Sequence, residues 1–221
     1  MDIIVEGRAS DFFKPDLVKI DLNFYTKTLD YKSALEKGAL NVEKFINDVL
    51  TSLNLKKEEL KTRSFNVREE VKYDYDKKQN YKDGFSYSQS ATLEFDYNME
   101  ILSKFMEITS KLDNPPKYII NFKIKNEEKV KSLVIAKAFS KAEEKAKMIA
   151  LAAGKRLKEC IKVDFRPFEE NVISNSNLNA MNIEKSCFLR KETNISETIQ
   201  KVFTPEDVEV SETLYCLWIT E

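Results

Sequence analysis

The sequence of 221 residues contains no histidine, only four glycines and only three cysteines. Without histidine the chain has no His-based catalytic triad, no histidine general base and no imidazole ligand for a transition metal. With so few glycines it also lacks the glycine-rich loops that cradle phosphate groups in nucleotide-binding proteins. These absences exclude most common enzyme templates, so we predict no catalytic, cofactor-binding or metal-binding residues.

The cysteines and the charge balance indicate the protein's compartment and the partners it favours. Cys160, Cys187 and Cys216 are far apart and form no C-x-x-C pair, so we expect free thiols in a reducing compartment. The 36 basic and 37 acidic residues give a net charge of -1, which favours no nucleic-acid partner. No apolar run approaches the roughly 18 residues of a membrane-spanning helix. The opening MDIIVEGRAS lacks the basic and apolar regions of a signal peptide, so we expect a cytoplasmic protein.

Hydrophobic periodicity predicts an α+β fold. Apolar residues at helical spacing indicate two or three helices, at about 30–53, 98–112 and 126–153. Alternating or short apolar runs indicate strands in a largely antiparallel mixed sheet, at about 2–6, 16–24, 64–75, 85–97, 118–124, 157–166 and 207–219. The last of these is apolar on both faces, so we expect it to be a central strand or to be covered by a partner. We predict a single domain over residues 1–221, in which the Asn-rich residues 169–200 form a mobile loop.

The most unusual of these elements is a long β-hairpin. Two alternating segments of about 13 residues each flank the polar stretch DKKQNYKDG, whereas strands are typically 5–6 residues long. We expect the turn at Asp83-Gly84, a pair of residues that favours hairpin turns. Strands of this length predict a hairpin that either crosses the whole domain or projects from it as an arm.

Aromatic residues gather near the end of this hairpin and define a predicted interaction surface of Tyr75, Tyr81, Phe85 and Tyr87. Tyrosine is enriched at the centres of protein interfaces, which favours contact with another subunit or protein. Ordinary cross-strand packing onto a core is the alternative. Packing accounts better for Tyr73 and Phe85, while Tyr81, in the polar stretch, is the better contact residue.

The third predicted helix carries alanine at every fourth position, at Ala138, Ala142, Ala146 and Ala150, and ends at Gly154. Residues four apart stack on one helix face, so this stripe allows a sheet or helix to approach the backbone closely. Glycine after the last turn supplies the left-handed conformation of a helix C-cap. We interpret the stripe as packing rather than chemistry.

These features together resemble the SIMPL domain family, which includes a bacterial periplasmic immunogenic protein and a mammalian adaptor of a Pelle-like kinase. The alanine-rich helix through Gly154 is the strongest similarity. The other similar motifs follow in the family's order: Val5-x-Gly7, Pro15-Asp16, Thr62-x-x-Phe65-x-Val67, Gly84-Phe85 and Phe203-x-Pro205. The resemblance covers about residues 2–168 and 202–219.

The resemblance implies an α+β fold, large ring-like or channel-like homo-oligomers and no established catalytic residues. Our leading hypothesis is therefore a non-enzymatic, self-assembling scaffold or protein-binding module. A monomeric cytoplasmic protein-interaction adaptor is the alternative. An enzyme that uses an unidentified Asp, Glu, Lys or Tyr site is a third possibility.

Overall fold

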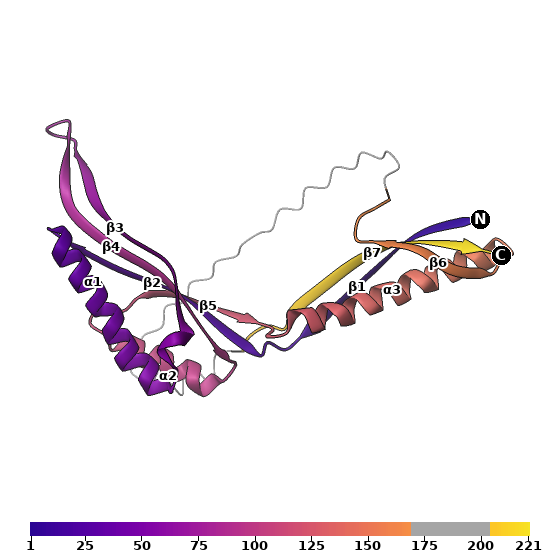
Figure 1. Ribbon diagram of the computed structural model, residues 1–221, viewed down its shortest axis with the longest axis horizontal. Coiled ribbons are helices and arrows are strands. Elements are labelled where there is room, and N and C mark those ends of the chain that lie inside the picture. The colour runs from indigo at the N-terminus through magenta and orange to yellow at the C-terminus, as the bar shows by residue number, and fades with distance from the viewer. Residues whose placement is uncertain (169–203) are drawn as a thin grey trace. The chain divides into compact units, whose positions relative to one another are not determined.

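A computed structural model describes residues 1–168 and 204–221. We expected one domain over residues 1–221; within it, the contacts of the described residues gather in two compact units (Figure 1). The described parts of the first unit are residues 1–14, 126–168 and 207–221, and those of the second unit are residues 15–125 and 204–206. The predicted α+β fold is confirmed, although the strands form two antiparallel sheets rather than one. The predicted loop at 169–200 lies outside the described residues.

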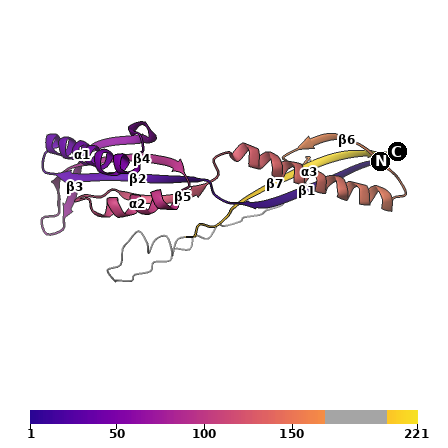
Figure 2. The same cartoon turned by 90° about the horizontal axis from the view of Figure 1, so that it is seen from below.

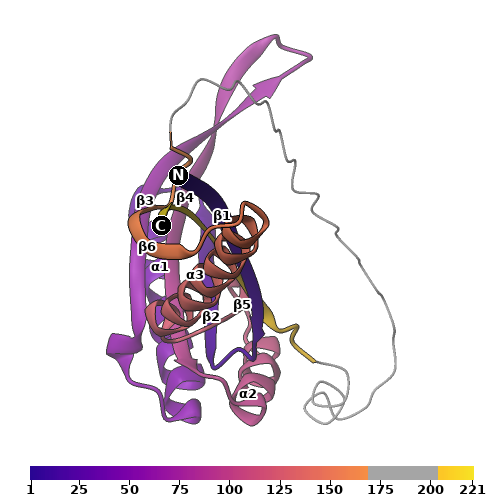
Figure 3. The same cartoon turned by 90° about the vertical axis from the view of Figure 1, so that its right-hand side faces the viewer.

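The first unit is a three-stranded antiparallel sheet with one long helix on one face. Its strands follow the order β1 (Asp2–Phe13), β7 (Val208–Thr220) and β6 (Leu157–Asp164). Helix α3 (Glu127–Ala152) runs along β1 and β7 (Figures 2 and 3). The two-faced final strand is therefore central, as predicted, because β7 has a paired neighbour on each side.

The alanine stripe faces this sheet, as its spacing predicted. Ala138, Ala142, Ala146 and Ala150 are completely buried. A Cβ atom added to Gly7 of β1 would collide with the Ala138 carbonyl oxygen and lie 2.7 Å from the Ala142 Cβ. Small residues on both sides thus bring the helix backbone against the strand. This contact also explains why β1 continues through Gly7, where we had predicted its end.

The end of α3 follows the predicted C-cap. Gly154 has a φ of 71°, a left-handed conformation that other residues resist. Its N–H donates to the Leu151 carbonyl at 2.9 Å, and the Lys155 N–H donates to the Ala150 carbonyl at 2.9 Å. This pair of bonds is a Schellman motif, which satisfies carbonyl groups that the helix end would leave without partners.

The second unit is a four-stranded antiparallel sheet in the order β3 (Leu60–Asp74), β4 (Gln79–Asp96), β2 (Leu17–Thr28) and β5 (Lys117–Lys123). Helices α1 (Tyr31–Phe45) and α2 (Met99–Ser110) flank it (Figure 2). Helix α1 continues through a π-helical turn (Ile46–Leu50) and a 3-10 turn (Thr51–Leu53). The core forms where helix and strand side chains meet, and its largest members are Ile20, Phe45, Leu50, Leu93, Leu102 and Phe105.

The contact between Gly7 and α3 predicts that Gly7→Val destabilises the first unit. The added side chain has no space, and overpacking of this kind costs about 1–3 kcal/mol. Trp218, the only tryptophan, is buried in this unit against Phe139, so its fluorescence in a urea titration reports unfolding there. Ser10→Val is the matched control, because Ser10 lies on the same strand but is exposed. Equal loss of stability in both variants would contradict the close contact.

Candidate functional site

The β3–β4 hairpin extends past its neighbouring strand. Strand β2 pairs with β4 only from Phe85 to Asp96, and its last residue, Thr28, lies opposite Phe85. Beyond this point β4 pairs with β3 alone, as Val71–Lys82 through Asp74–Gln79. We call residues 70–84 the hairpin arm (Figure 1). The prediction of a long hairpin is confirmed, and the arm is the part that lacks a third strand.

The turn of this hairpin is not at Asp83-Gly84, as we predicted, but at residues 75–78. The Asp74 carboxylate accepts the N–H groups of Asp76 at 2.9 Å and Lys77 at 3.1 Å, and Lys78 takes a left-handed φ of 51°. Gly84 lies within β4 instead, with a φ of 100° and the Thr28 carbonyl close to its Cα. An aspartate that caps its own turn therefore decides the position of the hairpin end.

The arm exposes four large apolar side chains. Tyr75 is 83% exposed, Val71 56%, Tyr73 47% and Tyr81 46%. The rings of Tyr73 and Tyr75 contact each other edge to face, with centroids 5.1 Å apart. Tyr73 lies opposite Asn80, whereas Tyr81 lies opposite Lys72, so the two tyrosines lie on opposite faces of the ribbon. Two of the predicted surface residues, Tyr75 and Tyr81, are thus accessible on the arm.

The other two predicted residues lie where the arm joins the core. Phe85 is half-buried, and its ring packs edge to face on Tyr31 of α1 at 5.8 Å. Tyr87 is only 2% exposed and covers Gly38 of α1, so its place in an exposed surface was wrong. Helix α1 covers the hairpin here, which alternation along β4 could not reveal. The same burial raises the pKa of the Tyr87 hydroxyl.

Tyr73 and Val71 are exposed arm residues that the sequence analysis did not include in the interaction surface. We had interpreted Tyr73 as packing on a core, because the alternation along β3 placed it on an apolar face. In the structure no third strand accompanies this part of the hairpin, so Tyr73 stays exposed. The predicted strand lengths did contain a signal. The strand before the first helix, at about 16–24, is shorter than either hairpin strand, so it cannot pair along the whole hairpin.

Ion pairs join the base of the arm to the sheet. The Asp83 carboxylate accepts from the ammonium groups of Lys27, on β2, and Lys72, on β3, the latter at 2.8 Å. Hydrogen bonds to these two lysines hold the pKa of Asp83 below its ordinary value. Glu70 accepts from the Ser86 hydroxyl at 2.5 Å and from Arg68 at 3.0 Å. These contacts hold the base of the arm in place at the point where β2 ends.

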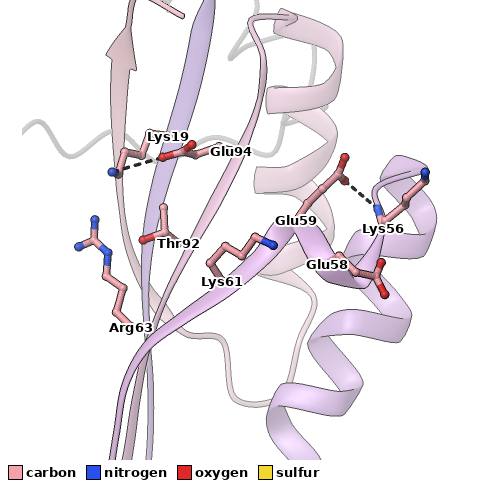
Figure 4. A pocket seen from close by; sticks show the side chains of 8 residues that line it. All are labelled: Lys19, Lys56, Glu58, Glu59, Lys61, Arg63, Thr92 and Glu94. Atoms are coloured by element: carbon pink, nitrogen blue, oxygen red, sulfur yellow. Dashed lines mark hydrogen bonds and ion pairs between the residues drawn. The ribbon is translucent and has the colours of Figure 1, made fainter.

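Two hollows lie elsewhere in the second unit. The larger, of about 520 Å³, is shown in Figure 4 and is lined by Lys19, Lys56, Glu58, Glu59, Lys61, Arg63, Thr92 and Glu94. Three of its seven charged side chains are in ion pairs: Lys19 with Glu94 at 3.3 Å, and Arg63 with Asp21, which is outside the lining, at 3.0 Å. The smaller, of about 460 Å³, lies between the end of α1 and the start of β3. Because four basic and three acidic side chains line the larger hollow together, it has no strong preference for a ligand of one sign.

The described residues give few indications of acid–base or metal chemistry. Wherever the pKa of a carboxylate is displaced in this part of the chain, it is lowered by hydrogen bonds and nearby cations, as in Asp11, Asp30, Glu70 and Asp83. Within residues 1–168 and 204–221, no three Cys, Asp or Glu residues are placed to hold a metal ion. No described helix has both the length and the apolarity needed to cross a bilayer.

Comparison with known families decides the chain's relationship. Residues 3–215 match the family model described as SIMPL, a protein of unknown function (DUF541). The chain belongs to the SIMPL family. No curated protein matches the sequence. Because the family's own description assigns no function, membership establishes the relationship and leaves the biochemical role to be argued from the residues.

Two motifs that suggested the SIMPL family meet in the structure. Gly7, from the V-x-G motif, lies on β1 against Ala138 and Ala142 of the alanine-rich helix. The motifs are separated by most of the chain, yet they form the two sides of one contact. In this SIMPL protein they therefore position the first unit's helix, whereas the hairpin arm belongs to the second unit.

The ion pairs at the base of the arm predict a low titration midpoint for Asp83. Because its folded-state pKa is lowered, its stabilising contribution is complete above the unfolded value of 3.8 and disappears as the pH falls through the folded value. NMR titration of the side-chain carboxyl should give a midpoint below 3.8, and the double variant Lys27→Met and Lys72→Met should raise it towards 3.8. Lys19→Met, which removes the partner of Glu94, is the control. An unchanged midpoint in the double variant would contradict the assigned cause.

Proposed function

We propose that this SIMPL protein is a non-enzymatic scaffold that assembles with copies of itself through the hairpin arm. The observation that supports this is the arm's exposed apolar surface of Val71, Tyr73, Tyr75 and Tyr81 on a two-stranded ribbon. An isolated two-stranded hairpin is only marginally stable in water, and a third strand or a packed face stabilises it. Contact with another chain supplies both. A cytoplasmic location stays a prediction from the sequence.

The hydrogen-bonding edges of the arm favour a strand as the contacting element. Strand β3 is at the edge of its sheet along its whole length, and β4 has no outer neighbour from Gln79 to Gly84. Each edge presents backbone N–H and C=O groups that can pair with an added strand. A second arm in antiparallel orientation would satisfy these groups and bring tyrosines together from both copies.

The charges of the arm favour a second copy over a partner of one charge sign. Residues 70–84 contain four lysines and four acidic residues, so the arm has no net charge. In a two-fold interface the same patch faces itself, so lysines of one copy can lie near carboxylates of the other. A strongly acidic or basic partner would gain nothing from this pattern.

The test is the mass of the particle in solution, measured by light scattering after size exclusion. We expect a discrete multiple of the 25.7 kDa chain mass. The variant Val71→Thr, Tyr73→Ser and Tyr75→Ser removes apolar contact while keeping the Asp74 turn. It should weaken assembly by at least about 5-fold for each tyrosine lost, because truncation of an interface tyrosine commonly costs more than about 1 kcal/mol.

The matched control is Ile119→Ser, because Ile119 is also an exposed apolar residue but lies on the opposite edge strand, β5. It should keep the wild-type mass. A wild-type particle of 25.7 kDa at every concentration would refute self-assembly and favour the monomeric adaptor, with the arm available for a different protein. An assembly that all variants retain would refute the arm as its interface.

A further inference from the structure

Two of the three cysteines lie on neighbouring strands. Cys160 lies on β6 opposite Trp218, and Cys216 lies on β7 opposite Val163. A β-bulge falls directly after Cys160, between its pair and the next one. The two cysteines are therefore diagonal neighbours across one strand pair, although 55 residues separate them in the sequence. Sequence spacing had given no reason to pair them.

The two side chains also share a face and an environment. Both belong to the hydrophobic cluster beneath α3, in which Cys216 is completely buried and Cys160 is half-buried. The thiol of Cys160 donates to the Lys162 carbonyl at 3.5 Å, and the Cys216 thiol has a side-chain hydrogen bond with Cys160. The two thiols therefore interact directly across the strand pair.

We propose that Cys160 and Cys216 are a redox-reactive pair, which a small-molecule disulfide such as oxidised glutathione converts into a cross-strand disulfide. The reaction begins at Cys160, the more accessible thiol. Its sulfur attacks one sulfur of glutathione disulfide, which forms a mixed disulfide, releases one glutathione and loses the thiol proton to solvent. The Cys216 sulfur then attacks the Cys160 sulfur, loses its own proton and displaces the second glutathione. Two thiols are thus oxidised and one glutathione disulfide is reduced.

The burial of Cys216 determines this order. Burial, with a smaller effect of the neighbouring Cys160, raises the pKa of the Cys216 thiol to about 11. At neutral pH it is almost entirely protonated, and α3 covers it, so it is a poor first nucleophile. Once Cys160 carries glutathione, the sulfur to be attacked is already beside Cys216. This proximity compensates for the weak nucleophilicity of the buried, protonated thiol.

The bond would join the edge strand β6 covalently to the central strand β7 and close the long segment between them. Closing a loop in this way restricts the unfolded chain, and the restriction grows with loop length. The first unit should then resist urea better when oxidised. The pair would stay reduced in a glutathione-reduced cytoplasm and would close in an oxidising compartment or under oxidative stress. This inference is independent of the proposed assembly through the arm.

The test uses the full chain with Cys187→Ser, which leaves only the proposed pair. After incubation with oxidised glutathione, acid quenching and alkylation in denaturant, intact mass spectrometry should show loss of two hydrogen atoms and no alkyl group. Trypsin should release a cross-linked peptide that contains Glu159–Lys162. The urea midpoint from Trp218 fluorescence should rise on oxidation and return after dithiothreitol.

Single-thiol variants in the same background separate the two steps. With Cys216→Ala, Cys160 should stop at the mixed disulfide with glutathione. With Cys160→Ser, the buried Cys216 should react at least 10-fold more slowly than Cys160 does, as a consequence of burial. Far-ultraviolet circular dichroism checks that each variant is folded.

Two results would overturn the proposal. One is a folded Cys187→Ser protein that accumulates the glutathione adduct at Cys160 without closing. The other is a protein that forms the disulfide only after urea unfolds it, because the native strands would then hold the sulfur atoms apart. In both cases circular dichroism first confirms that the protein is folded before oxidised glutathione is added.

Discussion

Each of the two sheets is covered on one face, the first by α3 and the second by α1 and α2. The hydrophobic burial on that face determines which of the remaining strands and side chains stay exposed. In the first unit the contact is unusually close, because alanines on α3 meet Gly7 on β1 with no space for another atom. In the second unit the larger side chains of α1 and α2 fill the space over β2 and β4. What these helices do not cover remains available for water or for another chain.

The hairpin arm follows from unequal strand lengths under that constraint. Strand β4 has 18 residues and its neighbour β2 only 12, so the first part of β4, from Gln79 to Gly84, has no third strand beside it. The boundary lies at Phe85, where the ring still packs on Tyr31 at the start of α1. Tyr87, two residues inside the boundary, is core, and Tyr81, four residues outside it, is exposed. The same residue type therefore has opposite roles within a few residues.

The two proposed properties belong to different units. The arm extends the second unit, whereas the cysteine pair lies beneath α3 in the first. Each unit has its own hydrophobic cluster, so a change in one cluster need not alter the other. Loss of the arm's tyrosines and oxidation of the thiols can consequently be studied separately in one protein.

Much of the local structure was predictable because periodicity and capping act over a few residues. The strands and helices, the alanine face of α3, the C-cap at Gly154 and the central place of β7 all followed from spacing, and the ordered motifs indicated the SIMPL family. The hairpin turn was misplaced by several residues, because the Asp74 side chain outcompeted the Asp83-Gly84 signal.

The sequence by itself thus determined which residues share a face, but not which face is covered. Nearness along the hairpin grouped Tyr87 with Tyr75 and Tyr81, and only the extent of β2 and α1 separated them into core and surface. Likewise, only the register of β6 on β7 placed Cys160 beside Cys216. Both outcomes depend on contacts between segments far apart in the chain, whose register and length no local pattern specifies.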